Sequence, residues 1–329
     1  MWTDEQSMTT AEIAPGQNTL QSAAELAAAL RANLTGVLRG KPDAVRLSVV
    51  ALLSGGHLLI EDVPGVGKTL LAKSLARSVN GTFRRVQGTP DLLPADLTGV
   101  SMPDPKDGTW RFRPGPLFAN VVLVDEINRA TPRTQSALLE AMEERQVTAD
   151  GGTLRLPDPF IVVATQNPHE HAGTFPLVEG QRDRLAMVIE LGLPDRDAER
   201  EILTGVGGTD ALRSLTPVAD AQELRRAVAA IRTVHVAPAV TEYLLDIAEA
   251  TRAHEGVSQG ASPRATLGTL RAAQANAVVD GRAYVTPDDV KAVAPGALAH
   301  RLILTGGQSL ERGRAVVDGI LRRLPPPRG

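Results

Sequence analysis

A glycine-rich segment between a short apolar run and a helix restricts the fold of this sequence more than any other feature. The run at residues 57–60 (HLLI) follows two glycines and is typical of a buried parallel strand, whereas residues 69–79 have helical spacing. The joining segment, residues 61–69, reads EDVPGVGKT. In such a turn, successive backbone N–H groups and the amino end of the following helix form a site for phosphate groups. The pattern therefore predicts a strand, a phosphate-binding loop and a helix.

Two side chains of this segment carry the expected chemistry. Lys68 is placed to reach the β- and γ-phosphates of a nucleotide, and the Thr69 hydroxyl is placed to bind Mg²⁺. The usual pattern begins with Gly six residues before the Lys, and Asp62 stands at that position here. We expect the nucleotide to be bound along the whole loop, by Asp62, Val63, Pro64, Gly65, Val66, Gly67, Lys68, Thr69 and Leu70.

Two further apolar runs, residues 121–124 and 160–164, end in polar residues. Ligands of open α/β sheets bind at the carboxyl ends of the strands, so these polar side chains are expected to meet the phosphate loop. Asp125 is predicted to hold Mg²⁺, and Glu126 to polarise a water molecule for attack on the γ-phosphate. Asn167, after the third run, is predicted to hold that water or the γ-phosphate. A Glu at position 126 favours hydrolysis over nucleotide storage.

The order of elements predicts an α/β domain followed by an all-helical one. Predicted helices alternate with the strands up to residue 193, which implies a parallel sheet covered on both faces. Beyond it only helices are expected, and Ser262-Pro263 and Thr286-Pro287 each supply an N-cap followed by Pro. We expect helices from Ala23 onward and at residues 43–53, 69–79, 132–145, 221–233, 239–253, 263–279 and 287–293. The predicted divisions are a mobile arm (1–21), a nucleotide-binding core (22–193), a helical domain (194–324) and a proline-rich tail (325–329).

Arg264 stands out for an electrostatic reason. It follows Ser262-Pro263 and so lies in the first turn of a predicted helix, where a cation opposes the helix dipole. A nearby anion would offset this cost. We therefore expect Arg264 to bind the γ-phosphate from the helical domain and to couple nucleotide state to the angle between domains.

Composition limits the classes of function. Lys and Arg total 35 against 38 Asp and Glu, a formal charge of −3, which disfavours a constitutive nucleic-acid binder. The absence of cysteine excludes disulfides and thiolate metal sites. No apolar run approaches the roughly 18 residues of a membrane span, and the first twenty residues lack Lys and Arg, so we expect a cytoplasmic protein. His169-Glu170-His171 has no further converging ligands and is not expected to bind a metal.

Taken together, these motifs resemble the MoxR family of AAA+ ATPases, in the group with a helix-2 insert and a pre-sensor-1 hairpin. The resemblance covers roughly residues 25–305 and is most specific at residues 60–69, 86–99, 125–130, 164–168 and 260–264. It implies that Lys68 and Thr69 form Walker A and that Asp125 and Glu126 form Walker B. It also implies Asn167 as sensor 1 and Arg264 as sensor 2. The insert at residues 87–116 and a hairpin at 145–156 are then expected to face the pore or upper surface of a ring.

The same resemblance implies an arginine finger that acts on the ATP of a neighbouring subunit. Arg184 fits that position, although Arg182 and Leu185 stand where the family generally has an apolar residue and Phe. Val37 and Gly40 match the segment that lines the adenine. A finger that acts in trans requires a closing ring, and the family implies a hexamer. The implied function is Mg²⁺-dependent ATP hydrolysis that remodels client proteins, often with a von Willebrand factor A domain, in metal-cofactor insertion or enzyme maturation.

Two other classes of function are compatible with the sequence. Helicase and restriction relatives share the insert, so a nucleic-acid motor is an alternative, which low basicity and scarce aromatic residues disfavour. A GTP-dependent switch is another, but the sequence has no Asn-Lys-x-Asp segment to read guanine.

Overall fold

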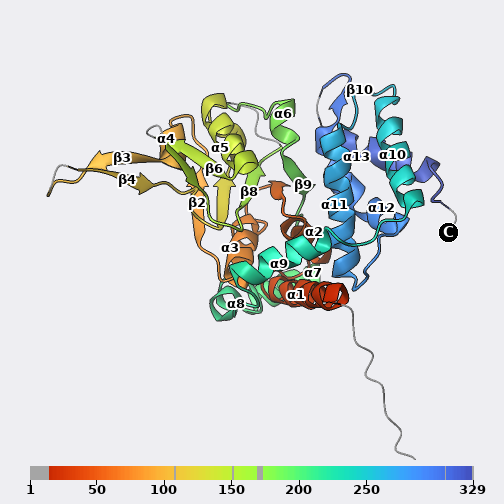
Figure 1. Cartoon of the computed structure of the whole chain (residues 1–329), viewed down its shortest axis with the longest axis horizontal. Helices are drawn as coiled ribbons and strands as arrows, with labels where there is room; N and C mark the ends of the chain where they lie inside the picture. Colours follow the sequence, from red (N-terminus) through yellow and green to blue (C-terminus); the bar gives the residue numbers. More distant parts are fainter. Residues whose placement is uncertain (1–14, 107–108, 150–151, 169–172, 308, 328–329) are drawn as a thin grey trace, which may run out of the picture.

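The computed structural model describes residues 15–106, 109–149, 152–168, 173–307 and 309–327, with side chains from residue 19 (Figure 1). A five-stranded parallel sheet forms its centre, in the order β2-β5-β8-β1-β9. The strands are β1 (His57–Glu61), β2 (Phe83–Gln87), β5 (Val121–Asp125), β8 (Ile161–Gln166) and β9 (Leu185–Ile189). The three predicted strands are therefore confirmed. Sequence reasoning missed β2 and β9, which are the two outermost strands of the sheet.

The register of the sheet places its two ends at different sites. Glu61 pairs with Gln166, and Gln87 pairs with Asp125, so the carboxyl ends of four strands share one edge. His57 pairs with Leu185 at the opposite, amino edge. Residues directly before β9 therefore lie a whole strand length away from residues that follow β1, β5 or β8.

Side chains of the central strands alternate between two hydrophobic layers, as expected for a sheet covered on both faces. Leu58 and Ile60 belong to one layer, which contains α1 (Pro15–Val37), α2 (Pro42–Leu53) and α3 (Lys68–Ser78). Leu59 belongs to the other, which contains α5 (Pro132–Glu144). Helix α1 begins at Pro15, earlier than the predicted Ala23, so the end of the predicted arm is helical. Residues 1–14 lie outside the described residues.

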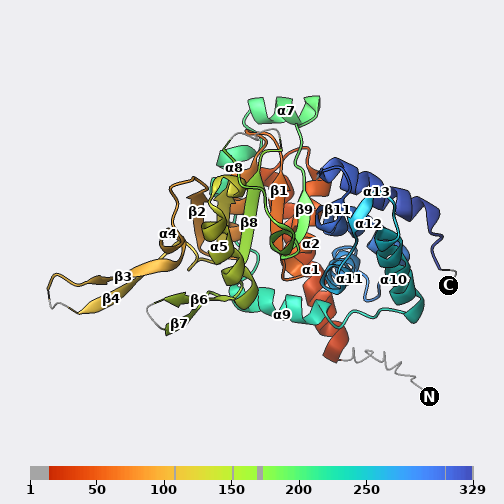
Figure 2. The same cartoon turned by 90° about the horizontal axis from the view of Figure 1, so that it is seen from above.

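The helices that follow the sheet form two groups (Figures 1 and 2). The first group consists of α7 (Arg196–Leu203), α8 (Gly208–Ser214) and α9 (Ala221–Ile231). Helix α8 packs on α1 and α3, and α9 packs on α1. The second is a bundle of α10 (Pro238–Arg252), α11 (Pro263–Val279), α12 (Pro287–Leu298) and α13 (Leu310–Arg323), with η2 (Ala299–Arg301) and the strands β10 (Val257–Gln259) and β11 (Ile303–Leu304). On these contacts we propose that the core continues through α9, past the expected boundary at residue 194.

Local sequence signals explain where the bundle helices begin. The Ser262 hydroxyl accepts a hydrogen bond from the Ala265 backbone N–H. The Thr286 hydroxyl accepts one from the Asp289 backbone N–H, and the Asp289 carboxylate accepts one from the Thr286 backbone N–H, which together form a capping box. Both predicted N-caps are confirmed. Helix α12 continues to Leu298, beyond the predicted residue 293. It lies against β9, and a Cβ at Gly296 would come within 3.3 Å of the Val188 carbonyl oxygen, so the close approach favours glycine there.

Two hairpins and three short helices complete the described chain. After α4 (Pro94–Thr98), β3 (Gly99–Pro103) and β4 (Trp110–Pro114) form an antiparallel arm that extends away from the body (Figure 2). Strands β6 (Gln146–Ala149) and β7 (Gly152–Arg155) form the hairpin predicted around residues 145–156. The remaining helices are η1 (Ile127–Arg129) and α6 (Glu179–Arg182). None of the helices in the described ranges is long and apolar enough to cross a membrane.

Candidate active site

A cavity of about 430 Å³ opens at the carboxyl edge of the sheet. Nine predicted site residues line it together: Pro64, Gly65, Gly67, Lys68, Thr69, Leu70, Asp125, Glu126 and Asn167. The structure thus brings the phosphate loop, the ends of β5 and β8 and the start of α3 to one place. Its remaining lining residues, which were not predicted, are Lys73, Arg85, Gln87, Thr165, Thr209 and Leu212.

The phosphate loop adopts a backbone that requires glycine at two positions. Gly65 has φ 87° and Gly67 has φ 106°, in the left-handed region that side chains disfavour, and Gly67 is the N-cap of α3. The Lys68 ammonium donates a hydrogen bond to the Asp62 carbonyl oxygen at 2.6 Å. Burial lowers the pKa of Lys68, while the charges of Asp62, Asp125 and Glu126 oppose this shift. The lysine is therefore held at the loop by the backbone and by the acidic residues around it.

Asp62, which replaces the usual first glycine of the loop, has a positioning role in the protein interior. Its carboxylate accepts hydrogen bonds from the backbone N–H groups of Val63, Leu191 and Gly192, each at 2.7 Å. Leu191 and Gly192 follow β9, so Asp62 ties the start of the phosphate loop to the neighbouring edge strand. The departure from the usual sequence pattern thus has a structural reason.

We expect Asp62→Ala to lower the free energy of unfolding by about 2–3 kcal/mol, because the buried N–H group of Leu191 and the half-buried one of Gly192 lose their acceptor. Urea unfolding measures this change, and the exposed Asp246→Ala in the middle of α10 is the matched control, expected within about 0.5 kcal/mol of wild type. Equal stability of the two variants would contradict the role given to Asp62.

The end of β5 places two carboxylates in different environments. Asp125 is buried and accepts a hydrogen bond from Arg85 Nε at 2.6 Å and one from the Thr165 hydroxyl at 3.3 Å. Glu126 has φ 55° and ψ 50°, a left-handed conformation that costs a non-glycine residue about 1–3 kcal/mol. Its carboxylate accepts hydrogen bonds from Gln87 Nε2 at 2.9 Å and from Arg129 Nη1 at 3.3 Å. Such strain, held by specific contacts, is typical of a functional residue.

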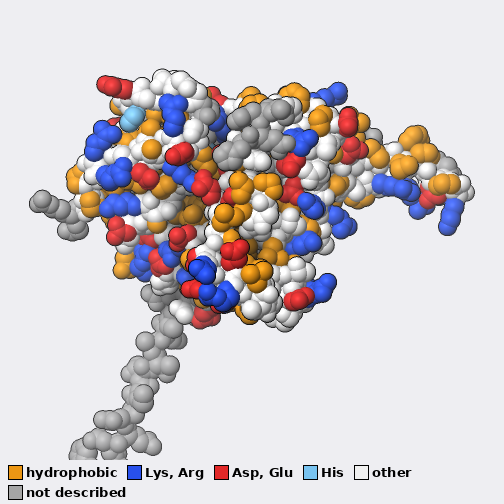
Figure 3. All heavy atoms as spheres, turned by 180° about the vertical axis from the view of Figure 1, so that it is seen from behind, with side chains coloured by type: hydrophobic (Ala, Val, Ile, Leu, Met, Phe, Trp, Pro, Cys, Tyr) orange, Lys and Arg blue, Asp and Glu red, His pale blue; other side chains and the backbone are white. Residues whose placement is uncertain are grey.

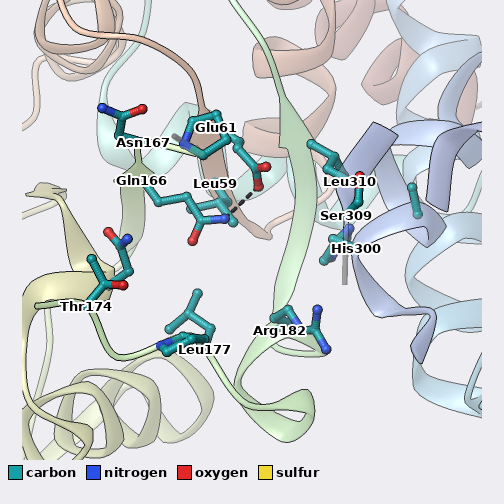
Figure 4. Close-up of a pocket in the computed structure, with 14 residues that line it drawn as sticks. Leu59, Glu61, Gln166, Asn167, Thr174, Leu177, Arg182, His300, Ser309 and Leu310 are labelled. Atoms are coloured by element: carbon teal, nitrogen blue, oxygen red, sulfur yellow. Dashed lines mark hydrogen bonds between the residues drawn. The ribbon is translucent and has the colours of Figure 1, made fainter. Parts of the chain in front are cut away.

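Asn167 also lines a second cavity, of about 250 Å³, that lies between the core and the helical bundle (Figure 4). Here the Gln166 amide donates to the Glu61 carboxylate at 2.6 Å; burial raises the pKa of Glu61, and this hydrogen bond partly offsets the shift. Arg182 lines the same cavity near His300, and burial lowers the pKa of Arg182. Its Nε atom is buried and has no hydrogen-bond partner among the described residues. Arg182 therefore extends into the interior of its own chain.

Arg184 and Arg264 lie far from the phosphate loop. Arg184 directly precedes β9 at the amino edge of the sheet, and Arg264 lies in the first turn of α11; both line a third cavity, of about 330 Å³. Both guanidinium groups contact the carboxylate of Glu143, at the end of α5. Arg264 therefore does not line the cavity that contains Lys68, and its binding of a γ-phosphate stays a prediction. Its position follows from the packing of α11 against α2 and β9.

The predicted adenine segment lies beside the loop but does not line its cavity. Val37 ends α1 and is buried, and Gly40 has φ 68° in the turn that follows. Leu38, between them, approaches Gly67, since a Cβ built at Gly67 would lie 3.4 Å from it. The cavity wall on this side comes instead from Thr209 and Leu212 of α8, which sequence reasoning missed.

No group of three or more His, Asp and Glu side chains that could hold a metal ion occurs in the ranges that the structure describes. The segment His169–His171, which is not expected to bind a metal, lies outside those ranges.

Several known proteins are similar to this chain in sequence and in fold. Residues 57–187 match the model of the ATPase family associated with various cellular activities (AAA), and residues 249–320 match an AAA lid domain. YeaC of Bacillus subtilis is 44% identical over 88% of this chain and 92% of its own length. Chaperone MoxR1 of Mycobacterium tuberculosis is 44% identical over 82% of this chain and 73% of that protein. Protein MoxR of Methylorubrum extorquens is 31% identical over 95% and 98%.

A crystal structure of a protein from Cytophaga hutchinsonii has the same fold, with a TM-score of 0.82 and 33% identity over 95% of this chain and 96% of that one. The predicted fold class, a parallel-sheet AAA+ core followed by a helical lid, is therefore confirmed, as is the prediction of an ATPase. Identity and coverage of this extent, together with the grouping of Lys68, Asp125 and Glu126 in one cavity, show that the chain belongs to the MoxR family of AAA+ ATPases.

Proposed function

We propose that this chain forms a closed ring, a hexamer, in which each ATP is hydrolysed between two subunits. The observation that carries the proposal is the separation of the site residues. Lys68, Asp125, Glu126 and Asn167 share the cavity at one edge of the sheet, whereas Arg184 and Arg264 share a cavity at the other. A ring with heterologous contacts places one edge of each subunit against the opposite edge of the next. Arg184 and Arg264 then complete the neighbour's site.

The cavity at the phosphate loop fits a nucleotide with Mg²⁺. The Thr69 hydroxyl and the Asp125 carboxylate both line it, and such oxygen donors are the ligands that Mg²⁺ prefers. When bound, the metal would neutralise charge on the β- and γ-phosphates. Lys68 adds a second positive charge there, and the backbone of residues 64–69 faces the phosphates.

In the proposed hydrolysis, Glu126 is the general base. Its strained backbone directs the carboxylate into the cavity, where it can accept a proton from a water molecule that attacks the γ-phosphate. Asn167, which lines the same cavity, orients that water or the γ-phosphate. Arg184 of the next subunit stabilises the charge that develops on the transferred phosphoryl group.

We propose that the energy of hydrolysis is used to remodel a client protein in the cytoplasm, as the name of the relative MoxR1, a chaperone, suggests. The arm formed by β3 and β4 offers a contact surface, because Val100, Met102 and Trp110 are exposed there, Trp110 to 72%. Figure 3 shows hydrophobic side chains on the surface of this arm. The client class suggested by the family is a protein with a von Willebrand factor A domain, in metal-cofactor insertion or enzyme maturation.

ATP turnover per subunit is expected to rise with protein concentration, because a site without its neighbour lacks Arg184 and Arg264. Steady-state hydrolysis measured over a dilution series, beside sedimentation velocity on the same samples, tests this expectation. Turnover should increase over the range in which the ring forms. A turnover that stays constant while the ring dissociates would contradict shared sites, and stimulation by DNA would favour the nucleic-acid motor instead.

A further inference from the structure

One carboxylate joins two arginines that come from different domains. Glu143 lies in the last turn of α5 and accepts a hydrogen bond from Arg184 Nε on Oε2, at 2.5 Å, and one from Arg264 Nη2 on Oε1. These two hydrogen bonds lower the pKa of Glu143. The side chains of Glu143, Arg184 and Arg264 are 30%, 32% and 50% exposed, so the cluster lies at the surface, accessible to another molecule.

The backbone that carries both arginines is held by contacts that do not involve Glu143. Asp183, beside Arg184, accepts a hydrogen bond from the hydroxyl of Ser262, the N-cap of α11, at 3.2 Å. The buried Arg301 donates to the Asp183 carbonyl oxygen at 3.1 Å and to the Leu185 carbonyl oxygen at 3.0 Å. Glu143 therefore acts on the ends of the two arginine side chains and is not needed to bring the domains together.

The arrangement leaves donors directed away from Glu143. Arg184 uses Nε for Glu143 and Nη1 for the Gly180 carbonyl oxygen, and its Nη2 has no partner among the residues described. Arg264 uses Nη2, so that its Nε and Nη1 are unpaired within the same part of the chain. Guanidinium groups of this geometry bind phosphate oxygens through two donors at once. The pair can thus hold a phosphate without releasing the carboxylate.

The charge balance of the cluster depends strongly on Glu143. Four arginines line the cavity, Arg184, Arg264, Arg271 and Arg301, and the acidic residues that line it are Glu143 and Asp183. Asp183 is already engaged by Ser262 and Arg301. Without the charge of Glu143, Arg184 and Arg264 would repel each other, and both side chains have the length and rotamer freedom to move apart.

We propose that Glu143 is a positioning residue for hydrolysis in the adjacent subunit. It holds Arg184 and Arg264 side by side, so that both reach the γ-phosphate bound by the next chain without reorganisation. The inference rests on the proposed function, because it requires these arginines to act in trans. Glu143 itself touches neither the nucleotide nor the attacking water.

Glu143→Gln tests the proposal, because the amide keeps the shape of the side chain but loses the charge. We expect kcat for ATP to fall about tenfold or more, since small misplacements of catalytic groups have effects of this size. KM should change little, because the arginines act on the transition state of another subunit's nucleotide. Glu144→Gln, one exposed position further along α5, is the matched control and should retain wild-type turnover.

Mixtures of variants separate this role from a general structural defect. An equimolar mixture of Glu143→Gln with Glu126→Gln should regain turnover, because the first supplies an intact phosphate site and the second supplies intact arginines. A mixture of Glu143→Gln with Arg184→Ala should not, because both changes lie at the same edge of the subunit. A general loss of folding would not give this pattern of recovery. Glu143→Ala, which also removes the charge, should give the same pattern as Glu143→Gln.

The outcomes distinguish the inference from the function on which it depends. Normal turnover in both Glu143 variants, with turnover lost in Arg184→Ala, would overturn the role of Glu143 and leave the shared site intact. Normal turnover in Arg184→Ala would overturn the shared site itself. Recovery in the mixture of Glu143→Gln with Arg184→Ala would show that Glu143 does not act at the arginine edge, and this too would overturn the inference.

Discussion

Glu126→Gln is expected to bind ATP as the wild-type chain does and to hydrolyse it about 10²–10⁴-fold more slowly, the usual range for loss of a general base. The amide has the same size as the carboxylate, so the cavity and the left-handed backbone of residue 126 can be kept. It can still accept hydrogen bonds from Gln87 and Arg129 through its remaining oxygen. What it loses is the ability to take a proton from the attacking water.

Two measurements separate binding from chemistry in this variant. Titration with a fluorescent ATP analogue should give the wild-type Kd, and single-turnover hydrolysis with enzyme in excess should show the slow step directly. Glu144→Gln, with the same chemical change on the far end of α5, should behave as wild type in both. Turnover retained in Glu126→Gln would assign the base to another group, whereas lost binding would mean that Glu126 holds the loop rather than the water.

The sequence predicted the catalytic edge of the sheet well, because the relevant signals are local. A strand followed by GVGKT, and a strand that ends in Asp125 and Glu126, fix their own geometry, and parallel strands bring them to one edge. The edge strand β2 was missed because Arg84, Arg85 and Gln87 are exposed and Val86 is its one buried residue, so its apolar signal is weak. Strand β9 is an apolar run of five residues, so the sequence contained a signal from which this strand could have been predicted.

The position of Arg264 could not be predicted in the same way. The pair Ser262-Pro263 fixes where α11 begins and places Arg264 in its first turn, and both features are confirmed. Which edge of the sheet that turn approaches depends on how α11 packs against α2 and β9, contacts that are distant in sequence. The role of Asp62 also depends on contacts that are distant in sequence, because its carboxylate accepts hydrogen bonds from the backbone N–H groups of Leu191 and Gly192.

The shared site predicts that Arg184→Ala lowers kcat by about 10³-fold or more, as for other arginine fingers, without lowering the affinity of the mutated subunit for ATP. Arg184 is absent from the cavity around Lys68, so its loss leaves nucleotide binding in the same chain unchanged. Arg182→Ala is the comparison variant. Arg182 lines an interior cavity of its own chain, so we expect it to retain far more activity than Arg184→Ala.

Mixing Arg184→Ala with Glu126→Gln gives the sharpest form of this prediction. In a randomly mixed equimolar ring, a site is competent when a subunit with Glu126 precedes one with Arg184, which occurs for about half of one half, or a quarter, of the sites. Turnover should therefore recover to about a quarter of wild type if the sites act independently. Each variant alone should stay near background. No recovery in rings shown to be mixed, or loss of activity in Arg182→Ala with full activity in Arg184→Ala, would reassign the finger. Activity that survives the loss of both arginines would mean that each subunit contains a complete site, and a nucleotide switch would then explain the chain better than a ring.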